Sequence, residues 1–303
     1  MSRKEQERFV SIACVNFHTK WGDKQANLRR METLVQEAAQ GGNHIIVFPE
    51  LALSGYECDE DIHASKQSCG MHRDLAETVP GPSTLKMAKL SKELDIYIIF
   101  GMPEQDKNNP AQRYISSALV SPDGILGTYR KLHLAPSPKF TEDVCFTPGH
   151  QIPVWETRYG TIGILICFDF WYFPELARIM ALKGARLIIN TTASEAGPGK
   201  PYFIVQQTGS RATENIAYTV SANLAGKERT KSFAGHSVIA GPLGPRPAHI
   251  FVEAGESEEM ISATLDFKKL RIRNESMPWQ KSRQSKLIQE ELSKLLFIGN
   301  TGV

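Results

Sequence analysis

Cys167 ends an apolar run that predicts a buried strand, Ile162–Cys167, and it precedes a turn and a helical stretch that begins at Pro174. A cysteine at such a strand end projects its thiol above the sheet, where the backbone N–H groups that follow it can face an oxyanion. Its ordinary pKa is about 8.5, so the thiol needs a base, a cation or a helix N-terminus to react near neutral pH. Taken alone, a buried cysteine is more often an inert core residue.

Glu50 is the first residue that could activate this thiol. A short β-rich run, His44–Phe48, is followed by Pro49, which cannot donate a hydrogen bond to a sheet, and then by the carboxylate. Apolar residues surround the glutamate in sequence. Burial there would raise the pKa of the carboxyl group and suit it to act as a base near neutral pH. A solvated carboxylate at a strand end fits the same pattern.

Lys131 is the second candidate partner. It lies in Tyr129–Leu134, at the end of a hairpin that Pro122-Asp123-Gly124 is predicted to turn. An ammonium group beside a reacting carbonyl stabilises the negative charge that develops on its oxygen. The same segment also fits an exposed basic strand end. His133 alternates with Lys131, so in a strand both side chains would face the same side. It is predicted to be a structural histidine, because such a residue is more often structural than a base.

Together these segments form a specific pattern. FPELALSGY, YRKLHL and CFDFWYFPE, in this order and at these separations, resemble the three signature segments of the nitrilase superfamily of carbon–nitrogen hydrolases. The similarity extends from Ser11 to about Leu287 and includes RATEN at 211–215. The resemblance implies an α/β fold, a four-layer α-β-β-α sandwich with two mixed sheets.

The resemblance also implies a catalytic triad at Glu50, Lys131 and Cys167. A second glutamate, Glu142 in Phe-Thr-Glu, would hold the lysine and orient the substrate. Cys167 would attack a carbonyl while Glu50 takes its proton, and Lys131 with the N–H of Phe168 would stabilise the oxyanion. Water would then hydrolyse the thioester. This mechanism needs no metal or cofactor.

The segment after Cys167 departs from the family pattern. Glu175 follows eight positions later, and Trp171-Tyr172 stands where many members have an arginine. A substrate carboxylate would lack its usual bidentate partner. We therefore predict an aromatic or apolar pocket formed by Phe168, Trp171 and Tyr172.

The preferred activity is an amidase acting on a neutral or aromatic amide, because Cys-Phe-Asp resembles the amidase and carbamoylase branches, whereas true nitrilases resemble Cys-Trp-Glu. The main alternative is an N-carbamoyl amino acid amidohydrolase. A nitrilase, an acyl transferase that passes the same thioester to an amine, and a non-catalytic binding protein are less favoured. Cys145 is not expected to be the nucleophile, since it is predicted to lie in a loop with no helix after it.

The elements that must position these residues alternate between strands and helices. Strands are predicted at 9–17, 44–48, 96–101, 116–120, 162–167, 186–191, 217–223 and 260–265, and helices at 23–40, 82–94, 174–183, 202–215 and 281–296. The repeated order suggests two similar halves. We predict a single domain over 1–303, whose tail, about 281–303, takes part in a homodimer or larger homo-oligomer, as the resemblance implies.

Composition excludes other classes of protein. The formal net charge of +2 gives no basis for nucleic-acid or membrane binding, and no apolar run reaches the length of a membrane span. The five cysteines are odd in number and irregularly spaced, which argues against a disulfide framework. No two of them have CxxC spacing, which argues against a structural zinc site. A reducing cytoplasm is the simplest expectation.

Overall fold

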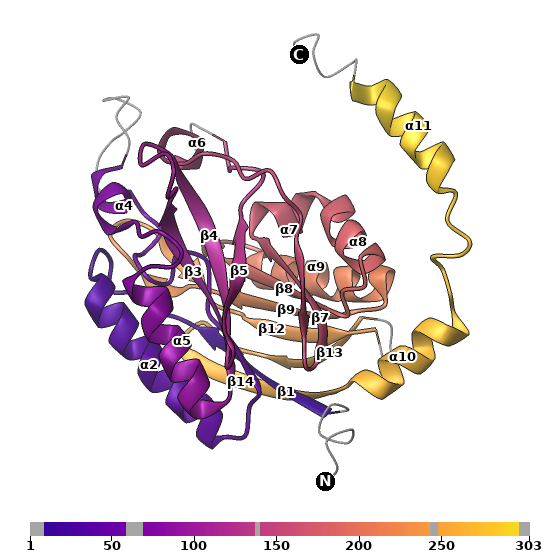
Figure 1. Ribbon diagram of the computed structural model, residues 1–303, viewed down its shortest axis with the longest axis horizontal. Coiled ribbons are helices and arrows are strands. Elements are labelled where there is room, and N and C mark those ends of the chain that lie inside the picture. Colours follow the sequence, from indigo (N-terminus) through magenta and orange to yellow (C-terminus); the bar gives the residue numbers. More distant parts are fainter. Residues whose placement is uncertain (1–8, 59–68, 137–139, 243–247, 297–303) are drawn as a thin grey trace. The chain divides into compact units, whose positions relative to one another are not determined.

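Two mixed sheets of six strands organise the protein (Figure 1). The computed structural model describes residues 9–58, 69–136, 140–242 and 248–296. The first sheet has the order β14-β1-β2-β3-β4-β5, the second β13-β12-β9-β8-β7-β6, and β10-β11 form a separate hairpin. The strands are β1 (Phe9–Asn16), β2 (Ile45–Val47), β3 (Tyr97–Gln105), β4 (Arg113–Ser121), β5 (Gly124–Arg130), β6 (Val154–Thr157), β7 (Gly160–Ile166), β8 (Leu187–Thr192), β9 (Tyr218–Asn223), β10 (Ala225–Lys227), β11 (Ser232–Ala234), β12 (Val238–Gly241), β13 (His249–Glu253) and β14 (Glu259–Asp266).

The two sheets repeat one pattern of strand directions. From β14 to β5, successive pairs are antiparallel, parallel, parallel, antiparallel and antiparallel, and the pairs from β6 to β13 follow the same series. This confirms the prediction of two similar halves with a mixed sheet in each. The halves are not separate along the chain, because β14 returns to pair with β1 in the first sheet.

Helices cover the outer faces of both sheets. In Figure 1, α2 (Lys24–Gln40) and α5 (Pro82–Leu94) lie on the side of the first sheet, and α8 (Pro174–Leu182) and α9 (Lys200–Asn215) on the side of the second. The apolar face predicted for the first of these helices is buried, and the side chain of Asp23 caps it by accepting from the N–H of Ala26 at 3.0 Å. The layers α-β-β-α confirm the predicted fold class.

Several elements were missed or extended beyond their predicted bounds. The strands β6, β10, β11, β12 and β13 and the short helices α4 (Gly70–Leu75), α6 (Glu142–Cys145) and α7 (Phe168–Tyr172) had no periodic signal long enough to predict them. Helix α9 begins two residues before its predicted start. The predicted turn-rich region at 241–247 lies mostly outside the described residues, since 243–247 are not described.

The chain divides into two compact units, Met1–Leu270 and Arg271–Val303. Helix α10 (Phe267–Ser276) spans their boundary, and α11 (Ser285–Leu296) belongs to the second unit. The sequence predicted one helix over 281–296, whereas the structure begins it at Ser285. No helix among the described residues is long and apolar enough to cross a membrane.

Strand direction gathers the candidate residues at one edge of the sheets. β2 and β3 are parallel, and two antiparallel steps through β4 make β5 run in the same direction. Their carboxyl ends therefore lead to Glu50 and Lys131 at one edge of the first sheet. In the second sheet the parallel strands β7 and β8 lead to Cys167 and Ala193. Carboxyl ends of strands are where ligands collect in α/β folds.

Candidate active site

Cys167 stands between the end of β7 and the first residue of α7. Its backbone has φ 46° and ψ −101°, an unfavourable conformation for a non-glycine residue and one that is typical of functional sites. Its N–H donates to the carbonyl of Thr191 at 3.0 Å and to Oδ1 of Asn190 at 2.9 Å. The predicted elbow is present, but the helix begins at once, at Phe168.

Glu50 is buried in a tight turn after Pro49. Leu51, which follows it, also has a positive φ of 49°. The turn closes against β3 only because residue 101 is glycine: a Cβ there would lie 2.4 Å from both the nitrogen of Leu51 and the oxygen of Pro49. From this turn Glu50 reaches across to the second sheet, where its Oε2 accepts from the N–H of Ala193 at 3.0 Å.

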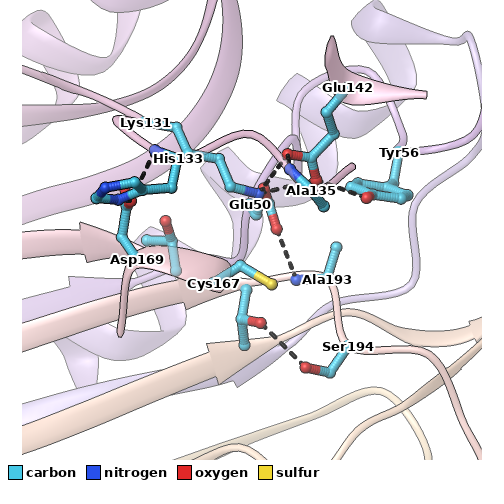
Figure 2. A network of polar contacts seen from close by, with 12 residues as sticks. Glu50, Tyr56, Lys131, His133, Ala135, Glu142, Cys167, Asp169, Ala193 and Ser194 are labelled. Atoms are coloured by element: carbon cyan, nitrogen blue, oxygen red, sulfur yellow. Dashed lines mark hydrogen bonds and ion pairs between the residues drawn. The ribbon is translucent and has the colours of Figure 1, made fainter. Parts of the chain in front are cut away.

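Lys131 lies one residue beyond β5 and is fully buried. Its Nζ lies 2.8 Å from Oε1 of Glu50 and 2.8 Å from Oε1 of Glu142 (Figure 2). Figure 2 shows the side chain of Cys167 pointing toward Glu50. The structure thus brings all four predicted residues together.

Glu142 is the first residue of α6 and has further partners of its own. The N–H of Ala135 donates to its Oε2 at 2.8 Å, and the hydroxyl of Tyr56 donates to its Oε1 at 2.6 Å. Sequence reasoning assigned no role to Tyr56. The signal was present, because Tyr56 closes the first of the three signature segments, six residues after Glu50.

Asp169 is the second residue that sequence reasoning missed. It is fully buried, and its carboxylate accepts from the backbone N–H groups of Leu132 and His133, both at 2.9 Å, and from the hydroxyl of Tyr129 at 2.7 Å. These partners flank Lys131 on both sides. Asp169 therefore ties the segment that carries the lysine to the first turn of α7, next to Cys167.

His133 agrees with its predicted structural role. Its Nδ1 lies 2.7 Å from Oδ1 of Asp169, and its ring stacks on Phe173 with centroids 3.5 Å apart. The separate expectation that His133 and Lys131 face the same side of a strand was wrong, however. β5 ends at Arg130, so strand alternation does not govern the direction of its side chain.

The electrostatics of the network follow from burial and charge. Burial raises the pKa of Glu50 to about 7, although Lys131 opposes the shift. Burial and then the Glu50 charge raise the pKa of the Cys167 thiol to about 12. Burial alone would lower the pKa of Lys131, but the carboxylates of Glu142 and Glu50 outweigh it and raise this pKa. At neutral pH the site therefore holds a charged lysine, a protonated thiol and a glutamate poised to exchange a proton.

The three predicted substrate residues differ in environment. Trp171 is buried, and its Nε1 donates to Oγ1 of Thr192 at 3.3 Å, so it packs within the protein. Tyr172 is 60% exposed, and Phe168, with its ring centroid 5.0 Å away, is half-buried. Only these last two have exposed ring surface to offer a ligand.

Arg211 from the RATEN segment is buried and points to the same region. Its Nε donates to the carbonyl of Phe170 at 3.0 Å, and its Nη2 to that of Trp171 at 3.0 Å. Its guanidinium also pairs with Glu214 at 3.2 Å. Arg211 therefore serves the end of α7, where it satisfies carbonyls that the short helix leaves without partners.

Two other features lie apart from this network. A cavity of about 710 Å³ is lined by Glu104, Asp106 and Arg130, among others, and none of Glu50, Lys131 and Cys167 lines it. Cys145 is the last residue of α6, which corrects the prediction that it lies in a loop.

The fold and this buried network define a class of enzyme. A family model described as carbon-nitrogen hydrolase matches residues 11–272, and the chain belongs to this family. The resemblance to the nitrilase superfamily is thereby confirmed.

Relatives in this family span nearly the whole chain. A probable nitrilase of Schizosaccharomyces pombe is 36% identical over 260 residues, which cover 85% of this chain and 89% of that protein. An omega-amidase of Danio rerio is 32% identical, over 87% of this chain and 91% of its own length. An N-carbamoylputrescine amidase of Solanum lycopersicum is 34% identical, over 88% of this chain and 89% of its own length.

A solved structure supports the same assignment. The crystal structure of a Saccharomyces cerevisiae protein, described as a member of branch 10 of the nitrilase superfamily, matches with a TM-score of 0.78 at 27% identity. The match covers 92% of this chain and 97% of that one.

Proposed function

We propose that this protein is an amidase in which Cys167 is the nucleophile, Glu50 the general base and Lys131 the stabiliser of the oxyanion. One observation carries the proposal: the buried ammonium of Lys131 bridges Glu50 and Glu142, at 2.8 Å from each, beside the strained Cys167. A buried cation beside two buried carboxylates is costly for stability. It is therefore readily explained by catalysis.

The first half of the reaction forms a thioester. Glu50 takes the proton of the Cys167 thiol as the sulfur attacks the carbonyl carbon of the amide. Lys131 and the N–H of Phe168, the first residue of α7, stabilise the negative oxygen of the tetrahedral intermediate. Glu50 then gives the proton to the nitrogen, the C–N bond breaks, and ammonia or an amine leaves.

The second half releases the acid. Glu50 takes a proton from water, whose oxygen attacks the thioester carbonyl. The second tetrahedral oxyanion is stabilised by the same groups. Its collapse breaks the C–S bond, and Glu50 returns the proton to the Cys167 sulfur. Each step uses only groups of this chain and water.

The substrate is a neutral or aromatic amide. The exposed ring of Tyr172, with Phe168 beside it and Phe203 at a centroid distance of 6.2 Å, supports an apolar contact surface. The aromatic residues at 171 and 172 replace the family's arginine, and Arg211 is engaged by backbone carbonyls. The omega-amidase among the relatives supports an amide substrate.

An N-carbamoyl compound is the second candidate substrate. The observation in its favour is the N-carbamoylputrescine amidase among the relatives. The same residues would act, but Cys167 would carry a carbamoyl group, and hydrolysis would release carbon dioxide and ammonia in addition to the amine. The two candidates therefore differ in the mass added to the enzyme.

Intact-protein mass spectrometry tests the proposal. The wild-type protein is quenched in acid during turnover of a panel of aliphatic and aromatic amides, N-carbamoyl compounds and nitriles. The expected result is an acyl adduct located on the peptide that contains Cys167, with none in Cys167→Ala. Added hydroxylamine should convert the adduct to a hydroxamate. An adduct located on another cysteine would refute the assignment of the nucleophile.

The proposal includes a homodimer or larger assembly in the cytoplasm. Helix α11 carries exposed apolar side chains, at Leu287, Ile288, Leu292 and Leu295, which support self-association. None of the five cysteines forms a disulfide, which supports a reducing compartment. Light scattering at micromolar concentration should give at least twice the 33.7 kDa mass of the chain. A monomeric mass would contradict the proposed assembly.

A further inference from the structure

A second cluster of reactive side chains lies outside the proposed mechanism. The ligand atoms of Cys58, Cys69, His72 and Cys145 all lie within 4.8 Å of one another. They come from three separate segments: the segment that follows Glu50, the start of α4 and the last residue of α6. Three of the four are buried and Cys58 is half-buried. Such a convergence of soft ligands from distant parts of the chain calls for a physical reason.

His72 has the arrangement of a metal ligand. Its side chain is 2% exposed, and its Nε2 lies 3.0 Å from the carbonyl oxygen of Gly55. A carbonyl only accepts, so Nε2 carries the proton and Nδ1 carries the lone pair. Nδ1 is buried and has no hydrogen-bond partner. A histidine that donates one ring N–H to a backbone carbonyl and leaves the other nitrogen as a ligand is the usual arrangement at metal sites.

The separation of the Cys58 and Cys145 sulfurs fits a tetrahedral ion better than a disulfide. The Sγ atoms of Cys58 and Cys145 are 3.6 Å apart. A zinc ion with Zn–S bonds of about 2.3 Å places two thiolate sulfurs roughly 3.8 Å apart, whereas a disulfide requires about 2.05 Å. Three sulfurs and one imidazole nitrogen form the Cys₃His set of structural zinc sites, and thiolates with tetrahedral geometry favour zinc over magnesium or calcium.

We propose that Cys58, Cys69, His72 and Cys145 bind one Zn²⁺ as a closed structural site. Binding converts three thiols to thiolates and releases three protons to solvent, while His72 binds in its neutral form. All four positions of the ion are then filled by protein, so the ion has no open position for substrate or water. The site would stabilise the fold without taking part in the chemistry at Cys167.

The sequence contained one local sign of this site. Cys69 and His72 are three positions apart, with Cys69 as the N-cap of α4 and His72 in its first turn, so both lie on one face of the helix. Only CxxC pairs were considered in the sequence, and their absence argued against zinc. That argument does not apply to ligands that the fold brings together from positions 58, 69, 72 and 145.

The ion would brace the active site through two of its ligands. Cys58 follows Tyr56 by two residues, and Cys145 follows Glu142 by three. The Tyr56 hydroxyl already donates to Glu142 at 2.6 Å, so the metal would add a second link between the same two segments. Zinc binding should therefore hold the carboxylate that positions Lys131.

Metal analysis of the purified full-length protein tests the proposal. We expect about one zinc per chain in the wild type, as for a structural site, and almost none in Cys69→Ser or Cys145→Ser. Cys14→Ser is the matched control, because Cys14 is buried in β1, outside the cluster, and should retain the zinc. Equal zinc content in Cys69→Ser, Cys145→Ser and the wild type would overturn the proposal.

Measurements on the wild-type protein test the proposal even if the cysteine variants do not fold. After removal of metal with a chelator under reducing conditions, titration with Co²⁺ should produce thiolate charge-transfer bands and the intense visible bands of a tetrahedral site, and Zn²⁺ should abolish them at one equivalent. Zn²⁺ should also raise the Tm of the metal-free protein. No cobalt spectrum, or a disulfide between Cys58 and Cys145 in freshly purified protein, would overturn the proposal.

Discussion

The Oδ1 atom of Asp169 lies 2.9 Å from the backbone nitrogen of His133 and 2.7 Å from its Nδ1. This contact joins the two sheets, since Asp169 follows the strand that ends at Cys167, whereas His133 follows the strand that leads to Lys131. The aspartate thus sets the distance between the proposed nucleophile and the proposed oxyanion stabiliser. It is fully buried and contacts neither reacting group through its carboxylate.

Asp169→Asn should lower activity by mispositioning Lys131. The amide has one acceptor oxygen, so its NH₂ group would face a backbone N–H of Leu132 or His133, and one buried donor would lose its partner. The expected loss is about 1–3 kcal/mol in the free energy of unfolding. We expect kcat to fall roughly 10- to 100-fold, which corresponds to an activation barrier higher by about 1.4 to 2.7 kcal/mol. Denaturant unfolding and steady-state kinetics measure the two effects.

Asp106→Asn is the matched control for this prediction. Asp106 also pairs with a residue of the same strand end, accepting from Nη1 of Arg130 at 3.1 Å, but it lines the separate cavity. Its substitution should leave kcat and the pH profile unchanged. If Asp169→Asn reduced stability but kept the wild-type kcat and pH profile, its positioning role would be excluded.

The raised pKa of Glu50 predicts the pH dependence of the reaction. The base must be ionised, so kcat/KM should fall as the pH decreases through about 7, the pKa that burial gives this carboxyl group. Because the pKa of Lys131 is raised, loss of its charge should not limit activity up to about pH 10.

The raised pKa of Glu50 also affects stability, because the folded protein holds the proton of this carboxyl group more tightly than the unfolded chain does. The stability that Glu50 contributes is therefore lost as the pH rises from the ordinary 4.5 toward 7.

Glu142→Gln provides an internal test of this assignment. The charge of Glu142 raises the pKa of Glu50, so its neutralisation should move the acidic midpoint of kcat/KM to lower pH. The midpoint belongs to the coupled Glu50–Cys167 pair as a whole. A wild-type midpoint near 4.5, unaffected by Glu142→Gln, would contradict Glu50 as the base.

Lys131→Met should abolish adduct formation and destabilise the fold. It removes the cation between two buried carboxylates, a change that typically costs about 3–5 kcal/mol. Lys89→Met is the control, because Lys89 pairs with Glu93 on an exposed helix face and should change stability by less than about 0.5 kcal/mol. Stability is measured by denaturant unfolding and the adduct by mass spectrometry.

The double variant Lys131→Met/Glu142→Gln separates folding from chemistry. Neutralising Glu142 removes one of the two carboxylates left without a cation, so part of the lost stability should return. Activity should not return, because no ammonium remains to stabilise the oxyanion. Recovery of activity in the double variant would show that Lys131 acts only through the fold.

The residues predicted from the sequence are those with a local signal. Glu50, Lys131 and Cys167 each follow a strand, and three ordered segments identified them together. Tyr56 and Asp169 were missed although they lie within those segments, because their roles depend on contacts with residues 86 and 40 positions away. The Cys₃His cluster was missed for the same reason. Side-chain contacts across the fold are not encoded by spacing in one segment.

The aromatic residues after Cys167 differ in exposure, which their residue types did not indicate. Their composition predicted a pocket, yet Trp171 is buried against Phe203 and bonded to Thr192. Hydrophobic residue types alone do not distinguish a pocket lining from a core. The solvent-exposed surface of Tyr172 and Phe168 distinguishes these two residues from the buried Trp171.

Gly101→Ala should impair catalysis through the turn that presents Glu50. The new Cβ would lie 2.4 Å from both the nitrogen of Leu51 and the oxygen of Pro49, and these are backbone atoms that cannot move aside as a side chain can. The turn must shift, so the hydrogen bond from the N–H of Ala193 to Glu50 and the contact with Lys131 would lengthen together. We expect at least a roughly 100-fold fall in kcat, since a displacement near 1 Å has effects of that size.

Gly197→Ala is the control, because a Cβ there meets nothing within 4 Å. Kinetics on both variants, with far-ultraviolet circular dichroism to show that each is folded, measure the difference. Equal activity in the two variants would mean that the position of Glu50 does not depend on this turn.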